Sequence, residues 1–173
     1  MTNKLIVTPL NHVDFKPFGE IIEVSGRCES KIINDGYATR YHDLAEVDVS
    51  SAGGRPLINI FRGRPRPLPL TIHMMEQHPL GSQAFIPLHR SPFVIVVAPP
   101  GQSVRPENLV AFITNGFQGV NYTRGVWHFP LLVLGENDQD FVVIDRGGDG
   151  DNCEERYFKD GERCILDLQD SET

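Results

Sequence analysis

Two stretches of the sequence carry polar side chains of acid–base character at spacings that could bring them together. In the first, Glu76 and His78 are separated by one residue and are followed by Gln83. If Glu76 and His78 share a strand, their even spacing directs both side chains to one face, and a strand resuming at Gln83 can place its amide alongside them. In the second, His128 follows a turn at Gly125 and precedes an apolar stretch. We therefore expect a carboxylate, an amide and two imidazoles to meet in one apolar hollow.

These residue types are suited to moving protons near neutral pH. An imidazole titrates in that range, so His128 or His78 can act as a general base, and we favour His128. Glu76 would act as an acid if burial raised its pKa, whereas beside a protonated histidine it would stay ionised and orient that ring. The same side chains could instead form a hydrogen-bonded plug that determines strand register. The sequence leaves these alternatives open.

The elements that must position these residues are predicted to be short strands. Glycine and proline recur along the whole chain, 16 and 13 times, and the apolar segments between them are short. This pattern predicts an all-β fold in which helix is confined to brief turns after Asn11 and from Pro106. Strands are expected over residues 4–8, 20–24, 57–62, 68–73, 83–88, 93–98, 110–114, 120–122, 131–134 and 141–145.

The domain organisation is predicted to be simple. No linker, repeat or low-complexity segment divides the chain, so residues 1–173 are expected to form one domain. The last part, roughly residues 154–173, is rich in charged side chains and is expected to be a surface tail.

The composition argues against several classes of function. The chain has 23 acidic and 16 basic residues, a net charge of −7 and no basic run, which disfavours nucleic acid as a partner. Its longest apolar run, residues 93–98, is too short for a membrane helix, and the N-terminus lacks the pattern of a signal peptide. Cys28, Cys153 and Cys164 have neither disulfide-framework nor zinc-finger spacing. We expect a cytoplasmic protein that acts on a small anionic molecule.

The order of the polar residues resembles the cupin superfamily, whose fold is a jelly-roll barrel, or double-stranded β-helix. Its first motif supplies His-x-His and then Glu or Gln, and its second supplies a final histidine. Glu76, His78, Gln83 and His128 match these four positions by spacing. Here a carboxylate replaces the first histidine and an amide replaces the glutamate. Because an amide is the weaker ligand for a divalent ion, these four residues could hold a metal but do not firmly predict one.

Longer segments resemble the ureidoglycolate lyase family. They are residues 34–44, 78–87, 112–116, 119–122, 127–128 and 144–148, and the similarity covers about residues 4–153. The resemblance implies a carbon–nitrogen lyase of the amidine-lyase type, which splits ureidoglycolate into glyoxylate and urea in allantoin degradation. It also implies a homodimer, and a divalent cation such as nickel has been associated with the family's activity.

A substrate of this kind needs a cation for its carboxylate. Arg62, Arg40 or Arg124 could grip it through a planar fork of two donors. Arg62 also belongs to a local basic cluster with Arg64 and Arg66, which could steer an anionic substrate or could be an exposed, proline-stiffened loop.

The ureido end of the substrate needs hydrogen-bonding partners and a pocket wall. Four side chains of the two polar stretches could serve, namely Gln83, Asn121, Tyr122 and Trp127. The ring of Trp127 could also belong to the core.

Two other functions fit the same residues. A hydrolase of the same substrate would release ammonia and carbon dioxide in place of urea. A cupin barrel without catalysis could be a sensor of small acids, because a fold does not by itself determine function.

Overall fold

The chain folds mainly into short strands, as the spacing of its glycines and prolines predicts. The computed structural model describes residues 3–101 and 103–168, whose strands form three larger sheets and one separate hairpin. Asn11 caps the short helix by accepting hydrogen bonds from the N–H groups of Val13 and Asp14, as expected. Helical elements among the described residues are α1 (His12–Phe15), η1 (Asn34–Gly36), η2 (Ser51–Gly53) and η3 (Pro106–Asn108).

One of the two sheets that frame the site has five strands. Val143 lies opposite Phe85, and Phe85 lies opposite Val120, so all three share the inner face of this sheet. The same register places Gln83 opposite Tyr122 on that face. In spatial order the strands are β3 (Gly19–Ile22), β12 (Gly119–Tyr122), β9 (Gln83–Pro87), β15 (Gln139–Gly147) and β6 (Arg55–Gly63).

The second sheet has seven strands and packs against the inner face of the first. Its two faces differ along β10, where Ile95 packs toward the five-stranded sheet and Val96 packs away from it. The strands are, in order, β16 (Glu154–Tyr157), β8 (Met74–Gln77), β13 (Trp127–His128), β10 (Phe93–Ala98), β11 (Val110–Ile113) and β2 (Val7–Pro9), with β14 (Leu132–Val133) also paired to β10.

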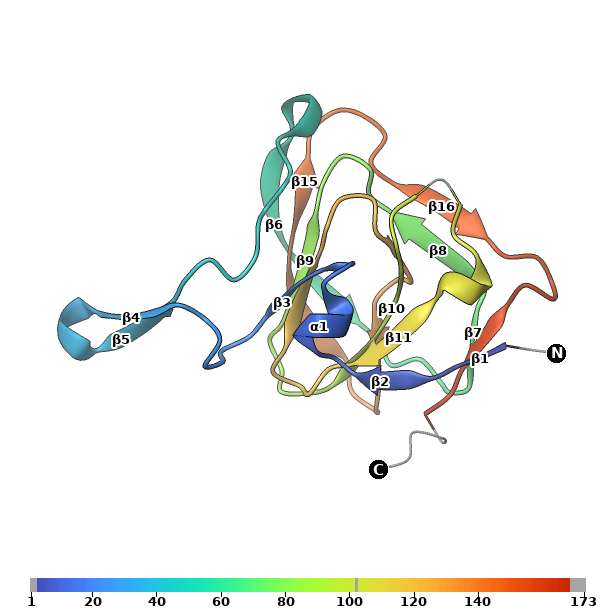
Figure 1. Ribbon diagram of the computed structural model, residues 1–173, viewed down its shortest axis with the longest axis horizontal. Helices are drawn as coiled ribbons and strands as arrows, with labels where there is room; N and C mark the ends of the chain where they lie inside the picture. Colours follow the sequence, from blue (N-terminus) through green and yellow to red (C-terminus); the bar gives the residue numbers. More distant parts are fainter. Residues whose placement is uncertain (1–2, 102, 169–173) are drawn as a thin grey trace.

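A third sheet covers the other face of the second. It consists of β1 (Asn3–Leu5), β17 (Cys164–Leu166) and β7 (Leu70–Ile72). Figure 1 shows the resulting order, with β6, β9 and β15 on one side, β10 and β11 in the middle, and β7 and β1 on the other side. The molecule therefore has two apolar cores, one on each side of the seven-stranded sheet.

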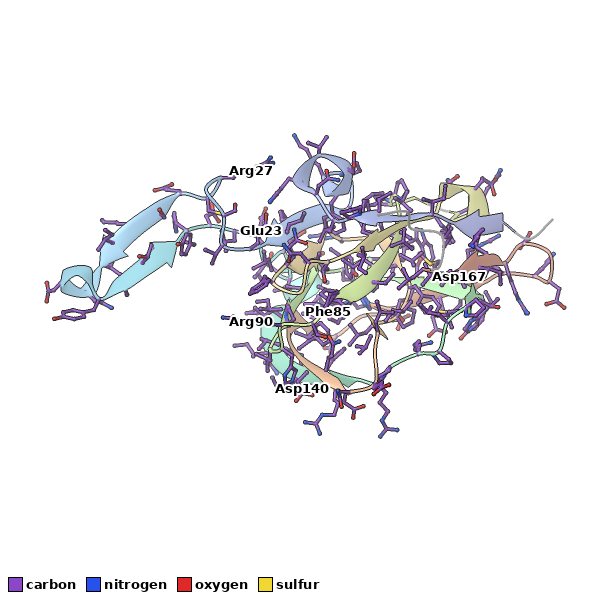
Figure 2. The ribbon with its side chains drawn as sticks, turned by 90° about the horizontal axis from the view of Figure 1, so that it is seen from below. Glu23, Arg27, Phe85, Arg90, Asp140 and Asp167 are labelled. Carbon is purple, nitrogen blue, oxygen red and sulfur yellow. The ribbon has the colours of Figure 1, made fainter. Side chains whose placement is uncertain are left out.

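A hairpin stands away from these layers. Its strands are β4 (Ser30–Ile33) and β5 (Ala38–Tyr41), which pair only with each other among the described residues. Figures 1 and 2, drawn from perpendicular directions, both show this arm extending from the body. Ile32 and Tyr37 are 69% and 93% exposed on it. The sequence did not predict the hairpin.

The surface tail predicted from residue 154 is wrong for most of its length. In this region β16 pairs with β8, and β17 lies between β1 and β7. Cys164 and Leu166 are fully buried, because these alternate residues face the core while the charged residues around them face solvent. The high charge of the segment concealed this apolar alternation. Residues 169–173 lie outside the described part of the chain.

Two expected strands lie where the chain passes from one sheet to another. The strand predicted over residues 4–8 is β1 followed by β2, and the one predicted over 68–73 is β7, after which β8 begins at Met74. In both cases the chain passes between the third sheet and the second. Apolar patterning locates the extended backbone, but it does not indicate a change of partner strand. No helix among the described residues has the length and apolarity to cross a membrane.

Burial of β17 leads to a test of its structural role. Replacing Leu166 by Ala should lower the free energy of unfolding by about 2–5 kcal/mol, because it leaves a cavity between the third sheet and the second. Ile165→Ala, at the half-buried neighbouring position, should cost clearly less. Urea denaturation of the two variants measures the difference. An unchanged midpoint for Leu166→Ala would mean that this segment is a surface tail.

Candidate active site

Side chains from both larger sheets meet between them. Glu76 on β8 lies directly opposite His128 on β13, and His78 follows β8 by one residue. One ligand atom from each of these three side chains lies within 4.8 Å of the others. Gln83, at the start of β9, interacts with His78 from the five-stranded sheet. The structure thus brings together the four residues that the sequence singled out.

Backbone carbonyls hold both imidazole rings. The Nδ1 atom of His78 lies 2.6 Å from the carbonyl oxygen of Asn152, and that of His128 lies 3.0 Å from the carbonyl oxygen of Val126. A carbonyl can only accept, so each Nδ1 carries a proton and donates it. The two Nε2 atoms are buried without a hydrogen-bond partner in the described chain. Both rings therefore present Nε2 to the space between the sheets.

Glu76 is held in its ionised form. Its Oε1 atom lies 3.4 Å from Nε2 of His128, whose side chain is almost entirely buried. Burial alone would raise the pKa of Glu76, but the adjacent imidazole of His128, with a further contribution from His78, lowers it below its usual value. Of the two roles considered from the sequence, this environment favours the ionised carboxylate that orients a histidine.

His78 differs from His128 in its surroundings. Burial lowers the pKa of His78, and the positive charge of a protonated His128 lowers it further. The ring centroids of the two histidines are only 5.2 Å apart, so two protonated rings would repel each other strongly. His78 is consequently the ring that stays neutral, with a free lone pair on Nε2.

Gln83 is supported by residues that the sequence analysis did not identify. Asp145 interacts with Gln83 and accepts a hydrogen bond of 2.9 Å from Asn59. Burial raises the pKa of Asp145, while these amide donors act in the opposite direction. Because the Gln83 nitrogen faces Asp145, its Oε1 atom remains buried and unpartnered. A polar residue at an inward-facing position of an apolar strand, as at Asn59, was the available signal.

Tyr122 is the other predicted residue that contacts the cluster. Its ring stacks on His128 with centroids 4.5 Å apart and an interplanar angle of 14°. Burial raises the pKa of the Tyr122 hydroxyl, and the charge of Glu76 raises it further, so the phenol remains neutral. Tyr122 thus fixes the plane of the His128 ring by contact rather than by charge.

Two other predicted residues face away from the cluster. Asn121 lies on the outer face of the five-stranded sheet, where it donates hydrogen bonds to Glu20 and to the carbonyl oxygen of Glu46. Trp127 packs in the core between the second and third sheets and donates to the carbonyl oxygen of Gly101. Strand alternation places both beside a site residue in sequence but on the opposite face.

Of the three arginines considered for the substrate carboxylate, Arg62 lies on the wall of a cavity beside the cluster but is already paired, and the other two do not line that cavity. Arg62 donates two hydrogen bonds to Asp140, of 2.7 and 2.9 Å. Arg124 donates to both carboxylate oxygens of Asp48. Arg40 lies on β5 of the hairpin that projects from the body (Figure 1), and it does not line the cavity.

An open cavity of about 480 Å³ reaches the cluster. Glu76 and Gln83 form part of its wall, and the end of β6 with the residues that follow forms another part. Phe85, which Figure 2 labels within the body of the molecule, and Leu131 supply apolar surface. This volume is in the range of small-molecule sites.

The cluster also has the donor set of a metal site. Glu76, His78 and His128 could hold a metal ion. The two unpartnered Nε2 atoms and the ionised carboxylate fit a divalent cation, because each offers a lone pair toward the same space. Glu76 belongs to a second such group with Cys153 and Glu155, both of which are exposed.

Comparison with known proteins identifies the family. A family model described as ureidoglycolate lyase matches residues 2–164, which is nearly the whole chain. The chain belongs to the ureidoglycolate lyase family. The match extends past residue 153, where the sequence analysis had placed its limit, and so includes β16 and the start of β17.

Relatives of this family share about half of their residues with the chain. A ureidoglycolate lyase of Azotobacter vinelandii is 52% identical over 94% of this chain and 96% of its own. One of Burkholderia mallei is 53% identical over 88% of both chains, and one of Pseudomonas savastanoi is 50% identical over 95% of both.

Proposed function

We propose that this member of the ureidoglycolate lyase family cleaves the carbon–nitrogen bond of ureidoglycolate to give glyoxylate and urea, as one step of allantoin degradation. The observation that carries the proposal is the pair of imidazoles whose free Nε2 atoms face an ionised carboxylate at the wall of a cavity. The 52% identity to a named ureidoglycolate lyase supports the same substrate.

The reaction needs one base and one acid. The base removes the proton of the substrate hydroxyl, the carbonyl of glyoxylate forms, and the electrons of the broken carbon–nitrogen bond pass to the urea nitrogen, which the acid protonates. No water is consumed. We assign the base to His78, because its neutral ring offers the Nε2 lone pair, and the acid to His128, because its Nε2 atom lies 3.4 Å from the Glu76 carboxylate. The sequence analysis favoured His128 as the base and considered Glu76 as the acid, so this assignment differs from it for both roles.

The remaining polar groups suit the ureido end of the substrate. The Oε1 atom of Gln83 can accept a hydrogen bond from the urea nitrogen, since its own amide nitrogen is directed to Asp145. Tyr122 holds the His128 ring in plane. Together they would orient the leaving group toward the proton of His128.

We also propose a single cupin-type jelly-roll domain for residues 1–173. The support is the packing of the five-stranded sheet on the seven-stranded sheet around a shared core, with the polar cluster between them.

A divalent cation such as nickel would be held by Glu76, His78 and His128, with the neutral Gln83 as a fourth group. When bound, such a cation supplies Lewis-acid stabilisation of an oxygen on the substrate. We propose that it is not required, because the two histidines and Glu76 already provide a base and an acid.

A homodimer, which the family resemblance implies, would have a candidate interface on the outer face of the five-stranded sheet. Ile60 is 58% exposed there, and the register aligns it with Val142 and then Ile86, while Ile58 is 78% exposed beside it. The hairpin arm, which carries the exposed Ile32 and Tyr37, leaves the body on the same side (Figure 1). We propose that a second copy of the chain covers this face and the arm, because adjacent exposed apolar side chains on a sheet mark an interaction surface.

Product analysis tests the function. The purified protein should release equal amounts of urea and glyoxylate from ureidoglycolate. His78→Gln and His128→Asn should each lower kcat by about 10²- to 10⁴-fold, because each removes a proton-transfer group. His73→Gln, which alters an imidazole outside the cluster, should keep wild-type turnover. Release of ammonia without urea would identify a hydrolase, and binding of glyoxylate without turnover would identify a sensor.

Metal removal tests whether a cation is required. Exhaustively chelated protein should retain appreciable activity. Calorimetric titration with nickel should show binding to the wild type that His128→Ala abolishes, because that variant removes one of the three ligand side chains. Complete loss of activity on chelation, with full recovery on adding metal, would contradict the proposal.

Sedimentation measurements test the interface. The wild type should be a dimer at micromolar concentration, and Ile60→Asp should be a monomer, since it buries an unpaired charge in the contact. Ile6→Asp, at an 81% exposed position outside this face, should remain a dimer. A dimer that persists in Ile60→Asp would place the interface elsewhere.

A further inference from the structure

The proposed reaction leaves one requirement unmet by the polar cluster. Ureidoglycolate and glyoxylate both carry a carboxylate, yet the cluster contains a carboxylate of its own, two imidazoles and an amide. None of these groups is an ammonium or a guanidinium, and Glu76 on the cavity wall is itself an acid that offers no paired cation to a second carboxylate. The substrate carboxylate must therefore lie on another wall of the cavity, near a cation.

Three arginines on the rim of the cavity could supply this cation. They are Arg62, Arg64 and Arg66, at and just after the end of β6. Arg62 is paired with Asp140 through two hydrogen bonds, so its charge is already compensated. The guanidinium of Arg66 lies 5.1 Å from the ring centroid of Phe129, over its face. For Arg64, the described part of the chain provides no hydrogen bond or ion pair.

The backbone around Arg64 is held on both sides. Gly63 pairs with Gln139 in the sheet, and Pro65 bridges to Val133. The N–H group of Arg66 also donates a hydrogen bond of 3.1 Å to the carbonyl oxygen of Val133. Arg64 is therefore an exposed side chain on a fixed segment of the rim, available to a ligand at little cost in backbone order.

We infer that Arg64 binds the carboxylate of the substrate, which makes it a specificity-determining residue of the proposed lyase. A guanidinium can donate two parallel hydrogen bonds to a carboxylate, and Arg64 has no competing acceptor within the described chain. Arg64 and the polar cluster lie on different parts of the same cavity wall, so attraction to Arg64 orients the substrate with its carboxylate at the rim and its hydroxyl and ureido groups toward the histidines. The inference rests on the proposed function for the identity of the anion.

Steady-state kinetics with product inhibition test this assignment. Arg64→Ala should raise KM for ureidoglycolate by roughly 10- to 100-fold, the loss expected for a charged hydrogen bond, with kcat changed much less. The inhibition constant for glyoxylate, which carries the carboxylate, should rise by a similar factor. That for urea, which is neutral, should stay the same. Arg64→Lys should restore part of the affinity, because it keeps the charge but loses the fork.

The controls separate this role from a structural one. Arg163→Ala removes a surface arginine that pairs with Asp160 and should leave all constants unchanged. Unchanged KM and glyoxylate inhibition in Arg64→Ala would overturn the inference, as would equal weakening of urea inhibition, or a larger effect in Arg62→Ala.

A binding measurement distinguishes failure of the proposed lyase function from failure of the carboxylate site. Glyoxylate binding to wild type and to Arg64→Ala can be measured by calorimetry without turnover. Suppose that the wild type binds glyoxylate without releasing urea and that Arg64→Ala does not bind glyoxylate. The function would then be wrong, and the carboxylate site would stand. If the wild type released urea and Arg64→Ala bound glyoxylate equally well, only the carboxylate site would be wrong.

Discussion

The pairing of Glu76 with His128 across two neighbouring strands is the interaction on which the rest of the site depends. A carboxylate and two imidazoles share a largely buried space, where an unpaired charge would be costly. Both Nδ1 atoms donate their protons to backbone carbonyls, so only the Nε2 atoms are left to interact with Glu76 and with a ligand. The protonation and hydrogen bonding of each side chain in the cluster therefore depend on its neighbours.

That pairing makes two chemically similar histidines unequal. His128 lies against Glu76 and is stacked on Tyr122, whereas His78 is buried beside a ring that can become positive. A positive charge at His128 therefore lowers the pKa of His78 and disfavours a second charge there. This asymmetry allows one histidine to accept a proton while its neighbour donates one, and the division of roles follows from environment rather than from residue type.

The five-stranded sheet separates two tasks by strand alternation. Its inner face carries Gln83 and its support Asp145, and its outer face carries the exposed isoleucines of β6. At the end of the same strand, the chain turns into the arginine-containing rim of the cavity. One sheet thus contributes to leaving-group contacts, to the entrance of the site and to the surface on which we place a second subunit. Substitutions only one residue apart in β6 are therefore expected to affect different properties.

The sequence by itself determined the mostly β character of this protein, its family, and the four polar residues that meet. Turn residues recur too often for long helices, and the site lies on short local motifs whose spacing survives in the fold. Only the tertiary structure decided what surrounds them. The tautomers depend on the carbonyls of Asn152 and Val126, the ionised state of Glu76 depends on its partner across the sheet, and the support of Gln83 comes from β6 and β15. The charged segment around β17 joined the core, and Asn121 and Trp127 turned away, because pairing between distant strands sets which face is buried. Such contacts join residues far apart in the chain, and the local pattern of apolar, polar and turn residues carries no information about them.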